Sequence, residues 1–279
     1  MPPLMCSVAK RKGTNRMANL KVIDVSHWNG TITWPTVAPS VDAVIIRAGY
    51  RGYGSAGTLA TDPKFAENAQ RANAAKIPLG VYWCSQALSD AEALEEARYC
   101  ASILRPFNVT FPVYLDSEHM APNATGRADK IGKKRRTQYG LTFCKAMRDY
   151  GYTVGLYCSE SWYADEIDGA AFDKAGFEIW IAKYSSQSPK YRCDAWQYSA
   201  KGKANGISGA VDLSHFYKDY RKKEVKVDPV EETLQNAIAD IGLNSPDLWR
   251  SILQGKRTAT AGNIKALMDK YHAAIAKKS

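Results

Sequence analysis

Residues 20–30 of this 279-residue chain read LKVIDVSHWNG, and this stretch decides between two fold classes. Its first six residues form an apolar, β-branched run that predicts a buried strand. In a doubly wound open sheet, the first strand usually leads into a glycine-rich loop that binds phosphate. Here the strand leads into Ser26-His-Trp-Asn-Gly30, which is no such loop. The sequence therefore favours a β/α barrel, with the open sheet as the alternative.

Further short β-rich runs continue the pattern along the chain. They lie at residues 41–48, 78–84, 111–116, 153–158, 178–183, 193–198 and 209–213. Several are apolar on both faces, which is typical of parallel strands covered by helices.

Helical patterns fill the early connections between these runs. The first covers residues 62–75 and begins with the N-cap pair Asp62-Pro63. The second follows Ser89, which forms a capping box with Glu92, and the third covers residues 134–150 and ends before Gly151. The later strands start only about 15 residues apart, which is too close for full crossover helices. We predict an α/β fold: an irregular TIM-like (β/α) barrel with eight strands and reduced helices in its second half.

Composition divides the chain into four parts. Residues 1–17 form a basic N-terminal extension that we expect to be disordered, and residues 18–220 hold the predicted barrel. Residues 221–229 are a charged linker that ends at a proline. Residues 230–279 carry three helical patterns, at 230–242, 245–255 and 263–278, which predict a small C-terminal three-helix unit.

The net charge of +10 lies mainly outside the predicted barrel. Residues 1–21 hold five basic side chains and no acidic ones, and residues 221–279 hold 11 basic and 7 acidic ones. A basic arm can bind nucleic acid, but no helix-turn-helix, zinc-finger or RNA-binding motif accompanies this one. No apolar run approaches the roughly 20 residues needed to cross a bilayer. We therefore expect neither a nucleic-acid partner nor membrane insertion.

The six cysteines are spread along the chain, and none forms a C-x-x-C pair. Most lie inside apolar strand or helix patterns, so we expect buried, reduced thiols rather than zinc ligands. We expect no metal ion and no cofactor.

Carboxylates stand at strand ends, where the reacting groups of a β/α barrel lie. Asp24 ends the first strand, Asp116 and Glu118 end the fourth, and Asp212 lies near the end of the eighth. The first and eighth strands are neighbours in a closed barrel, so Asp24 and Asp212 should approach each other. Asp116 and Glu118 are two residues apart and should point to the same side. Four converging carboxylates raise one another's pKa and favour glycoside hydrolysis over the alternative, a magnesium or calcium site.

Aromatic residues gather in or just after the same strands, which suits a sugar substrate because rings stack on the apolar faces of pyranoses. For each of them, packing in the core is the alternative. Strand alternation means that Tyr82 and Trp83 cannot both line a pocket. The set comprises Trp28, Tyr50, Tyr53, Tyr82, Trp83, Tyr114, Tyr157, Trp162, Trp196 and Tyr198.

Together these motifs resemble glycoside hydrolase family 25, the lysozymes (N-acetylmuramidases) of phages and bacteria. They follow the family's order over residues 18–220. The segments that carry the resemblance are Asp24-Val-Ser-His-Trp-Asn-Gly30, Ile46-Arg-Ala-Gly49, Tyr114-Leu-Asp-Ser-Glu118, Gly155-Leu-Tyr-Cys158, Trp180-Ile-Ala-Lys-Tyr184, Trp196-Gln-Tyr198 and Val211-Asp-Leu213.

The resemblance implies hydrolysis of the β-1,4 bond between N-acetylmuramic acid and N-acetylglucosamine in peptidoglycan, as by a phage or prophage endolysin. Glu118 matches the family's general acid. Asp116 matches the carboxylate that assists the substrate's acetamido group or stabilises the developing cation. Asp24 and Asp212 match the supporting pair. The residues that we predict to contact sugar are Tyr82, Tyr157, Trp196, Tyr114 and Arg47.

Two alternatives stay open. The same fold could serve as a catalytically weak peptidoglycan-binding module. An active site that has lost its catalytic function usually lacks the acid, however, and both Asp116 and Glu118 are intact.

The C-terminal unit follows a linker and carries a surplus of positive charge, so we expect it to anchor the enzyme to anionic wall polymers. A structural or dimerising tail is the alternative there.

Residues 1–16 lack the apolar core of a secretory signal, so we expect synthesis in the bacterial host cytoplasm and action on the wall after release.

Overall fold

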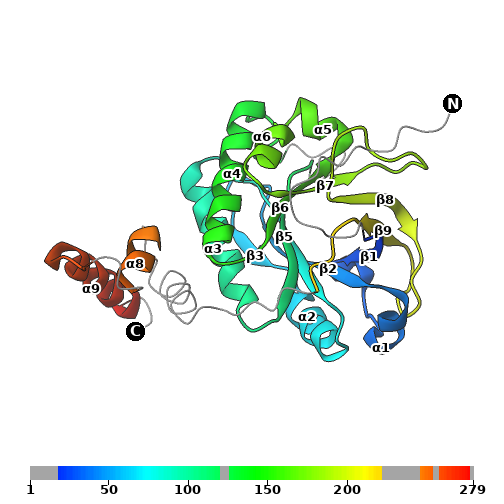
Figure 1. The fold of residues 1–279 in the computed structure, drawn as a ribbon, viewed down its shortest axis with the longest axis horizontal. Helices are drawn as coiled ribbons and strands as arrows, with labels where there is room; N and C mark the ends of the chain where they lie inside the picture. Colours follow the sequence, from blue (N-terminus) through cyan, green and yellow to red (C-terminus); the bar gives the residue numbers. More distant parts are fainter. Residues whose placement is uncertain (1–17, 120–125, 222–245, 254–257, 277–279) are drawn as a thin grey trace.

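The computed structural model describes residues 18–119, 126–221, 246–253 and 258–276 (Figure 1). The strands are β1 (Leu20–Val25), β2 (Ala43–Arg51), β3 (Leu59–Thr61), β4 (Leu79–Cys84), β5 (Val109–Asp116), β6 (Val154–Ser159), β7 (Glu178–Ala182), β8 (Ala195–Gly202) and β9 (Val211–Phe216). The helices are α1 (Trp34–Val37), α2 (Phe65–Ala74), α3 (Asp90–Leu104), α4 (Lys133–Asp149), α5 (Glu160–Asp165), α6 (Gly169–Lys174), α8 (Pro246–Leu253) and α9 (Ala261–Ala276). Short 3-10 turns are η1 (His27–Asn29) and η2 (Ala38–Ser40).

The strands form a closed barrel. Their order is β1-β9-β8-β7-β6-β5-β4-β2-β3, and β1 also pairs with β2, so eight strands complete the ring. The prediction of an eight-stranded irregular barrel is therefore confirmed. The short β3 was not predicted; it pairs with the end of β2 as an antiparallel addition outside the ring.

One strand runs against the expected direction. We predicted parallel strands from the several runs that are apolar on both faces, but β9 pairs antiparallel with both β8 and β1. Only residues 203–210 separate β8 from β9. A connection of that length allows a hairpin but no crossover, so the chain has to turn back. Asp212 consequently lies at the start of its strand, not near the end as predicted.

Helices cover the outside of the barrel more fully in its first half. α3 and α4 are long and pack against each other, whereas α5 and α6 have six residues each. The predicted reduction of helices in the second half is confirmed. Two predicted helix ends also match: Ser89 caps α3 by accepting a hydrogen bond from the Glu92 amide, and Gly151 follows α4 with a φ of 88°.

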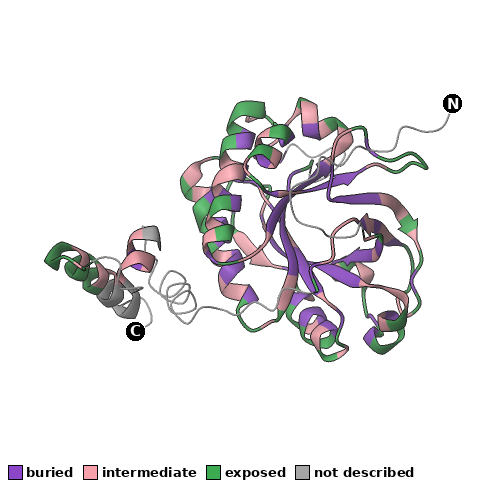
Figure 2. Cartoon of the chain, viewed as in Figure 1, coloured by how far each residue is buried: buried purple, intermediate pink, exposed green. Residues whose placement is uncertain are grey.

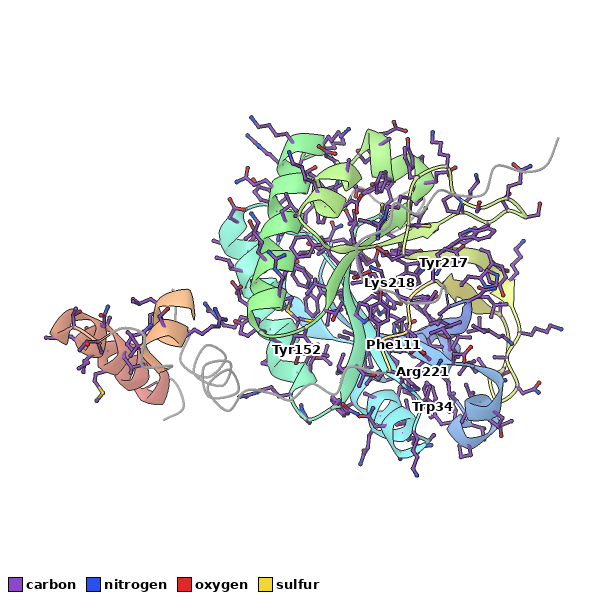
Figure 3. All side chains as sticks on the ribbon, in the orientation of Figure 1. Trp34, Phe111, Tyr152, Tyr217, Lys218 and Arg221 are labelled. Atoms are coloured by element: carbon purple, nitrogen blue, oxygen red, sulfur yellow. The ribbon has the colours of Figure 1, made fainter. Side chains whose placement is uncertain are left out.

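Most of the strands are buried on both faces and appear purple in Figure 2, whereas β3 and the second half of β8 are partly exposed. Outward residues pack under the helices; Trp34 of α1, labelled in Figure 3, belongs to this outer core. Inward residues fill the barrel itself, among them Phe111, Tyr114 and Phe216. Because this interior is packed, as in other β/α barrels, space for a ligand remains only toward its mouth.

Beyond the barrel, α8 and α9 coincide with the predicted helices at 245–255 and 263–278. Trp249 of α8 is buried. The extension 1–17, nearly all of the linker 221–229 and the helical pattern at 230–242 lie outside the described residues, so the division into domains stays a prediction. Each described helix is too short or too polar to span a membrane.

Candidate active site

A pocket of about 130 Å³ opens at the end of the barrel where the parallel strands finish. All four predicted carboxylates line it, so their convergence is confirmed. The lining residues are Asp24, Tyr82, Asp116, Glu118, Tyr157, Trp180, Tyr184, Gln197 and Asp212. Asp212 reaches this mouth because β9 is reversed: the start of an antiparallel strand lies beside the ends of its parallel neighbours.

Asp24 and Asp212 form a close pair across β1 and β9. They are direct partners in the strand register, and their carboxyl groups share a hydrogen bond. Burial raises the pKa of Asp24 well above its usual range, and the charge of Asp212 raises it further. Burial also raises the pKa of Asp212. The pair therefore retains a proton at a pH where isolated aspartates are fully ionised.

Gln197 fixes the orientation of Asp24. Its amide nitrogen donates to Oδ2 of Asp24 at 2.9 Å. Its carbonyl oxygen accepts hydrogen bonds from the hydroxyls of Tyr157, at 2.8 Å, and Tyr184, at 3.0 Å. With both ends of the amide engaged, Gln197 is fixed against rotation and presents a donor to the carboxyl group.

Asp116 ends β5 and is buried, with 3% of its surface exposed. Burial raises its pKa to about 7, although a hydrogen bond from Cys84 and the charge of Arg47 both lower it. Asp116 therefore changes its charge near neutral pH.

Glu118 lies just beyond β5, at the rim of the pocket. The residue is exposed, but its carboxyl group is crowded by protein, and this desolvation raises its pKa well above the usual range. The charges of Asp116 and Asp212 raise the pKa further. A carboxylic acid that stays protonated near neutral pH is suited to general acid catalysis.

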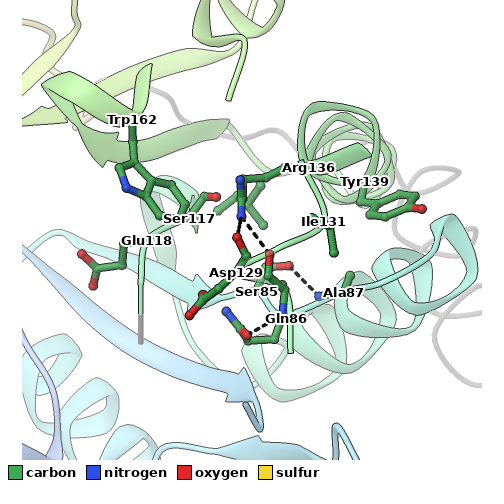
Figure 4. A pocket seen from close by; sticks show the side chains of 13 residues that line it. Ser85, Gln86, Ala87, Ser117, Glu118, Asp129, Ile131, Arg136, Tyr139 and Trp162 are labelled. Carbon is green, nitrogen blue, oxygen red and sulfur yellow. Dashed lines mark hydrogen bonds between the residues drawn. The ribbon is translucent and has the colours of Figure 1, made fainter. Parts of the chain in front are cut away.

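The chain after Glu118 is held by Arg136 of α4. Glu118 also borders a second, narrower pocket, and its carboxyl group points away from Arg136 (Figure 4). The Arg136 guanidinium donates to the carbonyl oxygens of Ala128, at 2.8 Å, and Asp129, at 3.1 Å. It also forms an ion pair with Glu166 at 3.0 Å. These contacts tie residues 126–132 to the barrel beside the rim.

Two of the five predicted sugar contacts, Tyr82 and Tyr157, line the pocket. Tyr114 does not: it lies two residues below Asp116 on the same inward face, is fully buried and packs against Trp180. Its inward position is deep in the barrel, away from the pocket lining, and its role as a sugar contact stays a prediction.

Trp196 also lies outside the pocket. Because Gln197 faces inward, Trp196 must face outward, where its indole nitrogen donates to the Lys183 carbonyl at 2.8 Å. Gln197, one residue further on, lines the pocket instead, and the role of Trp196 as a sugar contact stays a prediction. The pocket residues that the prediction missed are Trp180, Tyr184 and Gln197, all of which stand in the motifs quoted from the sequence.

Arg47 is not among the pocket-lining residues either, because Asp62 holds its guanidinium. The Arg47 Nε donates to Asp62 at 2.8 Å, and His27 Nδ1 lies 3.0 Å from the same carboxylate. We expected Asp62 to cap a helix, but α2 begins only at Phe65 and Asp62 is buried against these partners. Arg47 thus acts on the pocket through its charge, which lowers the pKa of Asp116.

Within the described residues, no group of three or more His, Cys, Asp or Glu side chains is arranged to hold a metal ion. The mouth offers carboxyl groups for proton transfer: one group set to remain protonated, one that ionises near neutral pH, and a proton-sharing pair beside them.

Known proteins are similar to this chain in sequence and in fold. The model of the family Glycosyl hydrolases family 25 matches residues 23–207. Lysozyme M1 of Streptomyces globisporus is 28% identical over 203 residues, which cover 70% of this chain and 66% of that protein. The structure of the modular autolysin LytC from Streptococcus pneumoniae, in complex with a synthetic peptidoglycan ligand, is 26% identical with a TM-score of 0.61 and covers 71% of this chain and 46% of LytC.

The catalytic domain of endolysin ply40, from bacteriophage P40 of Listeria monocytogenes, is similar in fold. It is 22% identical with a TM-score of 0.58, and the match covers 75% of this chain and 97% of that one. This chain thus matches a complete catalytic domain, but less than half of the modular LytC.

Proposed function

This chain belongs to glycosyl hydrolases family 25, and from that membership we propose that it is a muramidase (lysozyme). Its reaction is hydrolysis of the β-1,4 bond between N-acetylmuramic acid and N-acetylglucosamine in bacterial peptidoglycan. The observation that carries the proposal is one pocket in which Glu118 faces Asp116 and the Asp24–Asp212 pair. The relatives named lysozyme, and the autolysin with its peptidoglycan ligand, support the choice of substrate.

The pKa directions assign the roles. Glu118, held protonated, donates its proton to the oxygen of the breaking glycosidic bond. Asp116, once ionised, stabilises the positive charge that develops on the sugar. Water supplies the hydroxyl group of the new reducing end, and its proton restores Glu118. Asp24 and Asp212 hold a proton in place and keep the negative charge of the pocket low.

Digestion of purified peptidoglycan tests the reaction. Mass analysis of the products should find muramic acid at the new reducing ends; glucosamine there would contradict the proposal. Glu118→Gln should abolish the cleavage while its circular dichroism and thermal unfolding match the wild type. Binding to walls without any product, in the wild type, would instead favour the weak binding module.

We further propose that the C-terminal helices anchor the enzyme to anionic wall polymers. Residues 221–279 carry 11 basic and 7 acidic side chains, which favours a negatively charged surface. A chain ending at residue 221 should sediment with purified walls less than the full chain at low salt. Walls stripped of their anionic polymers should remove the difference. Equal sedimentation of both chains with intact walls would favour the structural or dimerising tail.

Synthesis in the cytoplasm of a bacterial host, from a phage or prophage gene, with release before action on the wall, remains our proposal for where the enzyme works. Fractionation of producing cells tests it: the protein should stay in the cytoplasmic fraction until lysis, and its steady appearance in the medium of intact cells would contradict the proposal.

A further inference from the structure

Cys84 ends β4 inside the barrel, directly beside Asp116. The two residues are partners in the register of the parallel strands β4 and β5, and the next amide, of Ser85, donates to the Asp116 carbonyl at 3.1 Å. The Cys84 thiol donates to Oδ2 of Asp116, also at 3.1 Å. Both side chains are buried. A thiol thus contacts the carboxylate to which we assign charge stabilisation.

We propose that Cys84 is a positioning residue of this active site: its thiol holds Oδ2 of Asp116 and fixes the orientation of this pocket-lining carboxylate. The inference rests on the proposed muramidase function, because that reaction gives Asp116 its role. In the described part of the chain, Oδ1 of Asp116 is buried without a hydrogen-bond partner. A carboxylate held at one oxygen cannot rotate freely and presents the other in a fixed direction.

The neighbours of Asp116 do not offer the same contact. Its charge acts on Asp24 of β1, on Tyr157, which is its register partner on the neighbouring strand β6, and on the rim residue Glu118. Those side chains are acidic or ionise only at high pH, and Asp212 of β9 lines the same pocket.

Two further side chains complete the surroundings of Asp116. Tyr82 of β4 faces it, and Arg47 of β2 acts through its charge while its guanidinium is bound to Asp62. Among the described residues, Cys84 is therefore the side chain that donates a hydrogen bond to this carboxylate.

A thiol is a weaker donor than a hydroxyl, which matters at this position. A strong donor would stabilise the ionised carboxylate more and lower its pKa further. The weaker bond orients Asp116 while leaving its pKa at about 7. Cys84 therefore fixes the orientation of the carboxylate while its protonated and ionised forms both remain accessible near neutral pH.

The test compares the wild type, Cys84→Ala and Cys84→Ser on purified peptidoglycan across pH. Loss of the donor in Cys84→Ala should move the acidic limb of kcat/KM upward by about half a pH unit, as expected for one weak hydrogen bond. It should lower kcat more than it changes KM. Cys84→Ser keeps a donor, so its acidic limb should stay at or below the wild-type position. Cys100→Ala, which removes a buried thiol from α3, should leave the profile unchanged.

Infrared spectroscopy supplies a readout that needs no activity. The S–H stretching band of Cys84, identified by its loss in Cys84→Ala, should shift as Asp116 titrates near pH 7. An S–H frequency that does not change during this titration would overturn the inference. A pH profile of Cys84→Ala that is identical to the profile of an active wild type would do so as well. A wild type that does not cleave peptidoglycan would overturn the proposed function instead, and the infrared result would still decide whether the thiol binds Asp116.

Discussion

At the scale of single residues, Asp116 links the chemistry of the pocket to the stability of the fold. Burial raises its pKa from an ordinary 3.8 to about 7. The folded chain therefore binds this proton more tightly than the unfolded chain does. The stability that this group contributes is complete below about pH 4 and is lost as the pH rises through about 7.

Asp116→Asn removes that ionisation and should reverse the loss. We expect its free energy of unfolding to exceed that of the wild type by about 2 kcal/mol at pH 8, with little difference at pH 4. Urea denaturation at both pH values measures it. Asp165→Asn, at an exposed site in α5, should change stability by less than about 0.5 kcal/mol at either pH. A variant that is less stable than the wild type at pH 8 would show that Asp116 does not destabilise the fold.

Gln197 is the residue through which Asp24 is oriented. Replacing it in Gln197→Leu removes the donor to Asp24 Oδ2 and leaves two tyrosine hydroxyls without their acceptor. A hydrogen bond to an acidic group is worth about 1.5–3 kcal/mol, so kcat/KM on peptidoglycan should fall roughly 10- to 100-fold. Gln187→Leu, at an exposed position, serves as the matched control and should keep full activity. Equal activity of the two variants would show that Gln197 does not contribute to catalysis.

At the scale of elements, a buried ion pair holds α3 against β2. The Arg51 Nε donates to Glu96 at 2.9 Å, and the Glu96 side chain is fully buried. Burial raises the pKa of Glu96 to about 7, whereas the charge and hydrogen bond of Arg51 lower it and so favour the ionised carboxylate. Losing Arg51 would leave that carboxylate inside the protein without compensation.

We therefore expect Arg51→Met to destabilise the fold by about 3–5 kcal/mol at pH 8. The loss should be smaller at pH 5, where Glu96 is protonated and needs no partner. Chemical denaturation at the two pH values measures both. Arg71→Met, which removes an exposed pair with Glu67, should cost less than about 1 kcal/mol. A loss for Arg51→Met that does not change with pH would show that packing, not charge, explains the effect.

The first turn of α4 carries charge of the wrong sign for a helix. It reads Lys133-Lys-Arg-Arg136 and contains no acidic residue, although the N-terminus of a helix favours negative charge. Lys134 is exposed, so Lys134→Glu should raise the free energy of unfolding by about 0.3–1 kcal/mol. Lys145→Glu, an exposed change farther along the same helix, should bring no such gain. Equal effects in thermal denaturation would rule out the helix dipole as the cause.

At the scale of the whole molecule, the barrel encloses its thiols. The five cysteines of the described residues form no disulfide and are buried, and burial raises the pKa of Cys84 and Cys158 beyond their usual range. In a Cys6→Ser background, the native chain should not react with a thiol reagent at neutral pH. All five thiols should react after denaturation. Rapid reaction of the native protein would show that the barrel opens readily.

Much of this protein follows from local sequence. The apolar runs predict the strands, their spacing predicts a barrel with reduced later helices, and the positions of Asp24, Asp116, Glu118 and Asp212 predict carboxylates at one mouth. The strands follow from short-range periodicity, and the places of Asp24, Asp116 and Glu118 follow from the rule that parallel strands end at the same side. Asp212 reaches the same mouth for another reason, because β9 runs antiparallel to its neighbours.

The tertiary structure decided the rest. The direction of β9 depends on how the barrel closes. Asp62 contacts Arg47 and His27 only because the folded chain brings β2 and η1 next to it. Strands that are apolar on both faces carry no polar side to mark which residues face inward, so the sequence did not show that Gln197, rather than Trp196, lines the pocket. Depth in the barrel, which buries Tyr114 below Asp116, likewise depends on partners distant in sequence. The sequence by itself determined that carboxyl groups gather at the mouth; long-range packing decided which side chains line the pocket there.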